Sequence, residues 1–310
     1  MAHDEGRAPF AGIVATVDVL IENFKLGGLK KYGLDYESLK AINPRLVYCS
    51  ITGFGQDGPY APRAGYDFII QAMAGMMSIT GEPGREPQKA GVAISDLFTG
   101  LYSVIAIQAA LRHAERTGEG QHIDMALYDS QISALGNQNL NYLVSGKSPV
   151  QMGNAHMNIA PYEVLPVKDG HIILAVGNDG QFGKFCAVVG LADLPANPDF
   201  ATNPARVANR ARLRETIIER LATFDRDSLL AKLEAAGVPA SPINTIGQMF
   251  ADPQTIARGM RLDLDDGHGN RLPSVRAPMV MSGTPLVYER SSPRLGEHTA
   301  EILAELEKAK

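Results

Sequence analysis

The most constraining feature of this sequence is a long apolar stretch at 97–111 that directly follows a single acidic residue, Asp96. The stretch is almost wholly apolar or small, so it predicts an enclosed helix rather than an amphipathic one. An Asp immediately before a helix is typical of an N-cap, because its carboxylate accepts hydrogen bonds from backbone N–H groups of the first turn. The same position suits a reactive carboxylate, since the helix dipole stabilises negative charge there. Local physics alone favours the plain cap.

The first half of the chain alternates apolar strands with helices. Strands are expected at 17–21, 46–51 and 122–127, and helices at 36–42, 66–79 and 129–143. Residues 66–79 have the apolar content of an enclosed helix, in which the methionines are core packing. The strand–helix–strand order predicts a parallel α/β sheet.

A glycine-rich segment at 53–58 (GFGQDG) follows a strand and satisfies the G-x-G-x-x-G fingerprint of dinucleotide-binding proteins. That fingerprint requires a helix to open at the glycines, so that its N-terminus meets the pyrophosphate. Pro59 and Pro62 follow here and prevent such a helix. We therefore interpret the segment as a turn and not as an NAD site.

The second half of the chain has the pattern of a smaller α+β domain. A hairpin is expected at 162–166 and 171–176 around the turn KDG at 168–170, followed by helices at 181–189, 211–222 and 227–236. From about 252 the chain turns back through short extended segments, and a closing helix at 298–306 is expected to pack on the first domain. These patterns predict a large domain at 1–150, a small domain at 151–255 and a return segment at 256–310.

Composition excludes several classes of function. A net charge of −5 argues against a nucleic-acid groove or an anionic-membrane binder. We find no apolar run of membrane-spanning length and no signal-peptide pattern, and no metal-ligand or redox spacing. Cys49 and Cys186 are isolated and lie in apolar runs, which predicts buried thiols in a reducing, cytoplasmic environment.

Several motifs together resemble those of family III CoA-transferases (CaiB/BaiF type), the group that includes formyl-CoA:oxalate and carnitine CoA-transferases. The motifs are DVLIENF at 18–24, GFGQDGPY at 53–60, GYD at 65–67, GVAISD at 91–96 and LGEHT at 295–299. The resemblance implies a large domain with a Rossmann-like parallel sheet and a smaller α+β domain. It also implies that Asp96 is the nucleophile. Asp129 likewise follows a strand and starts a helix, but the resemblance places it outside the catalytic position and leaves it as a cap.

The resemblance also implies a set of CoA contacts. These are the turn residues Asn23, Phe24 and Lys25, then Lys31 where the family usually has an Arg facing the CoA phosphates, and finally Arg63, Ala64, Gly65 and Tyr66 along the pantetheine and thioester end. A Lys keeps the charge but loses the bidentate fork of Arg. Without the resemblance, Lys25, Lys30 and Lys31 are better interpreted as a solvated basic turn. Residues 1–15 do not resemble the family, whose members are typically longer at this end, so part of the CoA-binding half is expected to be missing.

The activity implied is transfer of CoA from an acyl-CoA donor to a carboxylic acid through an aspartyl-CoA thioester on Asp96, with no permanently bound cofactor. The segments 78–84 and 153–156 resemble relatives that use succinyl-CoA and dicarboxylates. Family members form interlocked dimers, so a homodimer is expected. Two alternatives stay open. A racemase of this fold has a His thirty residues before the Asp, where this chain has Tyr66, a poor base because its reference pKa is about 10. A non-catalytic CoA-binding fragment is suggested by the shortened N-terminus.

Overall fold

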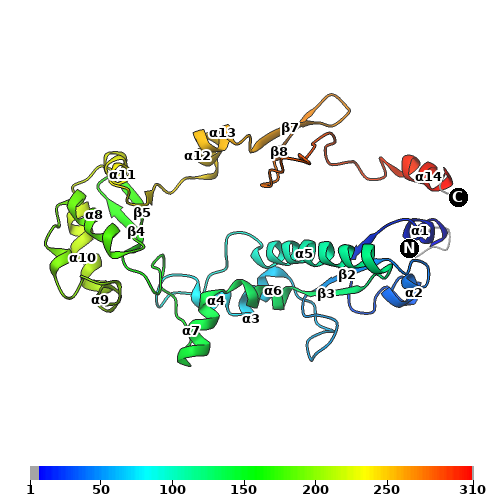
Figure 1. The fold of residues 1–310 in the computed structure, drawn as a ribbon, viewed down its shortest axis with the longest axis horizontal. Helices are drawn as coiled ribbons and strands as arrows, with labels where there is room; N and C mark the ends of the chain where they lie inside the picture. Colours follow the sequence, from blue (N-terminus) through cyan, green and yellow to red (C-terminus); the bar gives the residue numbers. More distant parts are fainter. Residues whose placement is uncertain (1–6, 309–310) are drawn as a thin grey trace. The chain divides into compact units, whose positions relative to one another are not determined.

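The structure is a computed structural model that describes residues 7–308, and it divides into two compact units. The first unit consists of Met1–Gly153 with Leu303–Lys310, and the second of Asn154–Ile302. Figure 1 follows the elements along the chain by colour. Of the residues 1–15, for which the sequence predicts no element, 7–14 form helix α1 (Arg7–Val14), and 1–6 lie outside the described residues. The predicted packing of 256–310 on the first domain stays a prediction.

A parallel sheet organises the first unit, as the sequence predicts. Its strands are β1 (Val19–Glu22), β2 (Val47–Thr52) and β3 (His122–Ala126), in the order β1-β2-β3. In register, Val19 lies opposite Val47, and Tyr48 lies opposite His122. The central strand β2 is buried over its first four residues, because helices cover both of its faces.

The two faces of β2 pack against different helices. Val47 and Cys49 point to one face and pack with Ile107 and Ala110 of α5 (Ile94–Thr117). On the other face Tyr48 packs in a cluster that includes Leu39 of α2 (Tyr36–Lys40), while α1 contributes Val14 and η2 (Lys30–Tyr32) adds Tyr32. This alternation is the period of two that a strand requires when both of its faces are covered.

The prediction that the apolar helix is enclosed is wrong for the described chain. The buried positions of α5 form a stripe of small or polar residues with one large apolar residue, Ile107, namely Ser95, Thr99, Ser103, Ile107, Ala110 and Ala114. Leu101 and Ile105 lie on the other side and are 63% and 64% exposed. Composition misled the prediction, because most of the large apolar residues of α5 face outward, while its buried positions, Ile107 apart, are small or polar.

Helix α5 also corrects the expectation that no run has membrane-spanning length. Its 24 residues are long and apolar enough to cross a membrane by length and composition alone. Its small-residue stripe packs on the sheet, however, with Ile107 and Ala110 in one cluster with Val47 and Cys49. Such packing is typical of the core helix of an α/β domain.

Two predicted helices are each divided by a glycine. The expected helix at 66–79 is α3 (Asp67–Met73) and α4 (Met76–Ile79), separated at Gly75, which has φ of 90°. The expected helix at 129–143 is α6 (Leu127–Ala134) and α7 (Asn137–Ser145), with Gly136 at φ of 55° between them. A positive φ is readily adopted only by glycine, and it ends the α-helical geometry. Phe68, Ile69 and Met73 are exposed, so α3 is not enclosed either.

The second unit is built on the predicted hairpin. Strand β4 (Tyr162–Val167) pairs antiparallel with β5 (Gly170–Ala175), which also pairs with β6 (Ala240–Ser241). The helices that follow are α8 (Asp179–Val189), η3 (Leu194–Ala196), α9 (Asn203–Ala208), α10 (Arg210–Leu221) and α11 (Arg226–Ala235). Their apolar faces and the hairpin enclose one core that includes Leu165, Ile172, Phe182, Phe185, Ile217 and Leu229.

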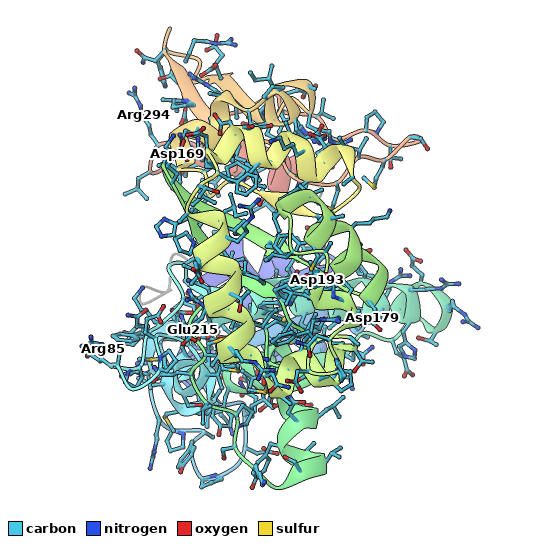
Figure 2. The ribbon with its side chains drawn as sticks, turned by 90° about the vertical axis from the view of Figure 1, so that its left-hand side faces the viewer. Arg85, Asp169, Asp179, Asp193, Glu215 and Arg294 are labelled. Atoms are coloured by element: carbon cyan, nitrogen blue, oxygen red, sulfur yellow. The ribbon has the colours of Figure 1, made fainter. Side chains whose placement is uncertain are left out.

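The second unit also buries the guanidinium of one arginine, Arg206. Arg206 of α9 is fully buried, and its guanidinium donates to the carbonyls of Ala160 (2.7 Å) and Phe200 (3.0 Å) and to Asp179 Oδ1 (2.7 Å). Figure 2 labels Asp179, which lies at the start of α8. Each of the three guanidinium nitrogens of Arg206 therefore has a hydrogen-bond acceptor, as a buried charge requires.

The C-terminal part of the chain consists of short elements. These are α12 (Ile246–Ala251), α13 (Pro253–Ala257), the antiparallel strands β7 (Arg261–Asp265) and β8 (Arg271–Val275), and the closing helix α14 (Thr299–Lys308). The closing helix was expected at 298–306, and the short extended segments before it are also as predicted.

Candidate active site

A cavity of about 540 Å³ lies in the first unit, next to the carboxyl ends of β1 and β2. Parallel α/β sheets commonly bind ligands at this end of their strands. The cavity brings together the sequence-predicted residues Asp96, Asn23, Phe24, Lys25, Arg63, Ala64, Gly65 and Tyr66. Lys31 does not line it. Its ammonium lies 4.8 Å from the ring centroid of Tyr32, and its contact with CoA phosphates stays a prediction.

The turn after β1 forms one wall of the cavity. Strand β1 ends at Glu22, whose Oε2 accepts a hydrogen bond from the backbone N–H of Phe24 at 2.7 Å. The Lys25 carbonyl accepts from Gly28 N–H at 2.8 Å, which tightens the turn further. Phe24 is left 52% exposed and Lys25 is exposed as well, so the turn offers an apolar ring and a cation to the cavity that both residues line.

Another wall of the cavity is formed where the backbones of two glycines, Gly53 and Gly65, are in close contact. A Cβ on Gly53 would lie 2.5 Å from the Gly65 Cα, and a Cβ on Gly65 would lie 2.7 Å from the Gly53 Cα. Any side chain at either position would therefore push the segment 63–66 away from the end of β2. No helix opens at 53–58, where the chain forms turns instead. Of the three glycines of the apparent dinucleotide fingerprint, Gly53 thus serves close backbone packing, while Gly55 and Gly58 adopt positive φ values of 90° and 81°.

Asp96 lies in the first turn of α5 and is not its N-cap, which corrects one prediction. The helix begins at Ile94, its N-cap is Ala93, and no side chain of its own caps it. The Ser95 N–H instead donates to Asp67 Oδ1 of α3 at 2.9 Å. Because Asp67 satisfies this end of the helix, Asp96 needs no capping role and its carboxylate is available to the cavity that it lines.

Burial and one neighbouring charge raise the pKa of Asp96. Partial burial raises the pKa of Asp96 above its usual value, and the like charge of Asp67 raises it further. The other charged groups that line the cavity are Glu22, Lys25 and Arg63. The guanidinium of Arg63 lies over the ring of Tyr60, with 3.9 Å from its central carbon to the ring centroid. A single cavity therefore holds a carboxylate of raised pKa together with two cations.

Sequence reasoning missed Asp67 as a site residue. Its two oxygens accept from Ser95 N–H and, at 2.7 Å, from Gln71 Nε2, while Gln71 Oε1 accepts from Ala90 N–H at 2.9 Å. Asp67 thus ties α3 to the start of α5, where Asp96 lies. The signal available in the sequence was the spacing of Asp67 and Gln71, since residues four apart in a helix face each other.

Asp129 does not compete for this cavity. It lies in the first turn of α6, whose N-cap is Ala126, so the prediction that Asp129 is a cap is wrong. Burial and the neighbouring Asp124 and Asp57 raise the pKa of Asp129. The side chain of Asp129 does not line the cavity, whereas Asp96 does. A ligand bound in this cavity would therefore meet Asp96 and not Asp129.

A smaller cavity of about 150 Å³ adjoins the same turn. Glu22, Lys25 and Leu26 line both cavities, and the smaller one also reaches Lys30 and His122. The basic turn 25–31 therefore borders both cavities. Among residues 7–308 no group of three or more His, Cys, Asp or Glu side chains is placed to hold a metal ion.

Comparison with known proteins places this geometry in a family. The model of CoA-transferase family III matches residues 1–299. The chain is 59% identical over 303 residues to a succinate–glutarate CoA-transferase of Agrobacterium fabrum, covering 98% of this chain and 76% of that protein. It is 39% identical over 295 residues to succinyl-CoA:glutarate CoA-transferase of Homo sapiens, covering 95% of this chain and 67% of that protein.

A solved structure agrees with the sequence comparison. The crystal structure of a CaiB/BaiF family protein from Brucella suis superposes with a TM-score of 0.85 at 60% identity, covering 98% of this chain and 79% of that one. The chain belongs to CoA-transferase family III, and its fold is the fold of that family. The resemblance drawn from the motifs is thereby confirmed.

Proposed function

We propose that this protein transfers CoA from succinyl-CoA to a dicarboxylic acid such as glutarate, through an aspartyl-CoA thioester on Asp96. The observation that carries the proposal is the placement of Asp96 in a cavity with the predicted CoA-contacting residues other than Lys31. The family and the names of the two relatives support the class of reaction and the dicarboxylate. Acyl-CoA and carboxylic acid are both substrates, and no permanently bound cofactor is required.

The first half-reaction moves CoA onto the protein. An oxygen of the ionised Asp96 attacks the thioester carbon of succinyl-CoA, the C–S bond breaks, and CoA leaves as a thiolate. The product on the protein is a mixed anhydride of succinate and Asp96. The thiolate then attacks Cγ of Asp96, the bond between Cγ and the bridging oxygen breaks, and succinate leaves as a carboxylate. This is covalent catalysis by a side-chain carboxylate.

The second half-reaction consists of the same steps in reverse, with the acceptor acid in place of succinate. The acceptor carboxylate attacks Cγ of Asp96, CoA leaves as a thiolate, and a second mixed anhydride forms. The thiolate attacks the acceptor's acyl carbon, which releases the new acyl-CoA and restores the Asp96 carboxylate. No proton is consumed in the cycle. Each intermediate stays activated, so the energy of the thioester is kept as long as water is excluded.

The remaining residues have roles that follow from their chemistry. Lys25 supplies a positive charge and Arg63 a planar fork, and both suit phosphate or carboxylate groups of the substrates. Asn23, Phe24, Ala64, Gly65 and Tyr66 offer amide, aromatic and backbone contacts to the pantetheine arm. The raised pKa of Asp96 makes its carboxylate a stronger nucleophile than an ordinary aspartate, as long as the pH keeps it ionised.

We also propose that the protein is a cytoplasmic homodimer that needs neither membrane nor nucleic acid. The outward apolar face of α5, which includes Leu97, Leu101 and Ile105, is exposed in the single chain, as are Leu143 and Val144 of α7. Exposed apolar faces of this kind are typical of subunit interfaces. Sedimentation at micromolar concentration should give a dimer, and a monomer alone would contradict this part of the proposal.

Isotope exchange tests the proposed reaction. With labelled succinate and succinyl-CoA but no acceptor, a covalent transferase exchanges label into succinyl-CoA, because the first half-reaction is reversible. Addition of glutarate should then give glutaryl-CoA. A racemase would instead exchange the α-hydrogen of an acyl-CoA with solvent. A folded protein that binds CoA but does neither would be the non-catalytic binding module.

A further inference from the structure

A hydrogen bond between two fully buried polar side chains lies directly beside Asp96. Ser95, its neighbour in α5, and Gln131 of α6 are both 0% exposed, and the Ser95 hydroxyl donates to Gln131 Oε1 at 2.7 Å. The backbone N–H of Ser95 is held separately, by Asp67 Oδ1 at 2.9 Å. The residue that precedes the nucleophile is therefore fixed from two helices, through its main chain by α3 and through its side chain by α6.

We propose that Gln131 is a positioning residue for Asp96, acting through Ser95 to hold the first turn of α5 in the orientation that the transfer reaction needs. This inference rests on the proposed function of Asp96. Neither Ser95 nor Gln131 lines the cavity, so neither is proposed to touch a substrate. Their role is to restrict where the Asp96 carboxylate can lie.

The other buried hydroxyls of these two helices behave differently. Thr99 donates to the Ser95 carbonyl, Ser103 to the Thr99 carbonyl and Ser130 to the Ala126 carbonyl, each four residues back in its own helix or its cap. The bond to the carbonyl is local in each case, and the hydroxyls of Ser103 and Ser130 also bond to the sulfurs of Cys49 and Met125 on the sheet, but none of these bonds joins α5 to α6. Ser95 uses its hydroxyl to reach a different helix, which is why its removal should have a distinct effect.

The burial of Gln131 lowers the free energy of unfolding, and this argues for a role other than stabilising the fold. Its Nε2 has no hydrogen-bond partner among the described residues, although the atom is buried. A buried amide that leaves a donor unpaired is less stable than an apolar side chain of similar size. The favourable part of its environment is the bond to Ser95, and that bond acts on the turn that carries the nucleophile.

We expect the bond between Ser95 and Gln131 to hold the Asp96 carboxylate at a fixed distance from its charged neighbours. In the held turn, partial burial and Asp67 keep the carboxylate at a raised pKa, within a cavity whose other charges are Glu22, Lys25 and Arg63. If the turn is released, the carboxylate can move toward solvent, and its pKa should fall toward that of an ordinary aspartate. The loss of the bond should therefore change both the rate of transfer and the titration of Asp96.

Four variants separate positioning from general stability. Ser95→Ala and Gln131→Met each remove the bond, Ser95→Thr keeps the hydroxyl, and Ser130→Ala removes a neighbouring buried hydroxyl that bonds to Ala126 and Met125 and not to α5. We expect Ser95→Ala and Gln131→Met to lower kcat by roughly tenfold to a hundredfold, because small displacements of reacting groups have effects of this size. KM for succinyl-CoA should stay within about twofold, since no substrate contact is lost. Ser95→Thr and Ser130→Ala should retain nearly full activity.

The double variant tests whether the two residues act as one unit. If they do, Ser95→Ala combined with Gln131→Met should lower kcat no further than either change alone. Multiplied effects would overturn the proposal. Ser95→Ala removes a single oxygen atom, so it carries the test by itself if Gln131→Met does not fold.

A second readout does not depend on catalysis. Carbodiimides react with protonated carboxyl groups, so the pH profile of Asp96 labelling, followed by peptide mass mapping, reports its pKa in the free protein. We expect Ser95→Ala and Gln131→Met to move this profile to lower pH, and Ser130→Ala to leave it unchanged. If all three variants match the wild type in profile and in kcat, the positioning role is wrong. If the wild type transfers no CoA but the profile moves as expected, the proposed function fails and the positioning of Asp96 stands.

Discussion

The two units of this chain have very different interiors. The second unit encloses one continuous apolar core that includes Phe182, Phe185 and Ile217. Its buried Arg206 has a hydrogen-bond acceptor for each guanidinium nitrogen. The first unit has several smaller apolar clusters, and between its helices it buries polar side chains: Gln71, Ser95, Thr99, Ser103, Ser130 and Gln131. One of these, Gln131, keeps an unpaired donor.

The difference follows from where the candidate site lies. A reactive carboxylate must be held in one orientation, and hydrogen bonds fix orientation better than apolar contacts, which are non-directional. In the first unit, three polar side chains, Asp67, Ser95 and Gln131, make hydrogen bonds that hold the residue next to Asp96. The second unit carries no such demand in its core and packs it with large apolar residues.

The largest expected effect is the loss of catalysis when the nucleophile is removed. Asp96→Asn should lower kcat for CoA transfer by roughly 10⁴-fold or more, because an amide cannot form the covalent intermediate. Because partial burial and Asp67 disfavour the charged form, the variant should be at least as stable as the wild type at pH 7. Steady-state transfer assays and thermal unfolding check the two parts. Substantial residual transfer would mean that another group is the nucleophile.

Substitutions in the two interiors should have unequal effects on stability. Phe185→Ala in the second unit should lower the free energy of unfolding by about 3–5 kcal/mol, since Phe185 is fully buried in the apolar core. Ser103→Ala in the first unit should change it by about 1 kcal/mol or less, because it removes only a hydroxyl that bonds to the Thr99 carbonyl of its own helix and to the Cys49 thiol. Urea denaturation measures both. Equal losses would contradict the contrast between the units.

The pH dependence of transfer should reflect the raised pKa of Asp96. The nucleophile must be ionised, so the rate should fall as the pH drops through a pKa above that of an ordinary aspartate. Asp67→Asn removes the like charge but keeps an oxygen for the Ser95 N–H. It should therefore lower the pKa of Asp96 and move the acidic limb of the kcat/KM profile to lower pH. A limb that stays in place would mean that Asp67 does not set this pKa.

The smallest expected effect concerns the two cysteines, one in each unit. Burial raises the pKa of the Cys49 thiol and raises that of Cys186 to about 12. Little thiolate is present at pH 8, and both side chains are 0% exposed. Neither should react with iodoacetamide in the native protein, and transfer activity should survive the treatment, while both should react in denaturant. Modification of either residue in the folded state would contradict their burial.

Much of the fold was predictable, because periodicity and turn chemistry are local. The strands β1, β2 and β3 and the hairpin around Gly170 lie close to where the sequence predicts them. The helix breaks at Gly75 and Gly136 were missed, since a glycine within an apolar pattern is compatible with a continuous helix. The exposed face of α5 was also missed, because composition alone does not tell which residues of a uniformly apolar helix face outward.

The candidate site was predictable where motifs carry it and not where it depends on distant contacts. The motifs identified Asp96, the turn at Asn23 and the segment around Gly65, and all of these line one cavity. The bond between Ser95 and Gln131 joins residues 36 positions apart and leaves no local pattern. The cap that Asp67 provides to α5 likewise joins two helices, so the sequence instead suggested Asp96 as the cap.

The central claim is that Asp96 becomes covalently bound to CoA, and trapping measures this most directly. Purified protein would be incubated with succinyl-CoA and hydroxylamine, and its peptides mapped by mass, with Asp96→Asn treated in parallel. The account predicts a hydroxamate at Asp96 in the wild type and none in the variant. Modification at a different residue, or no modification in folded wild-type protein that binds CoA, would contradict it.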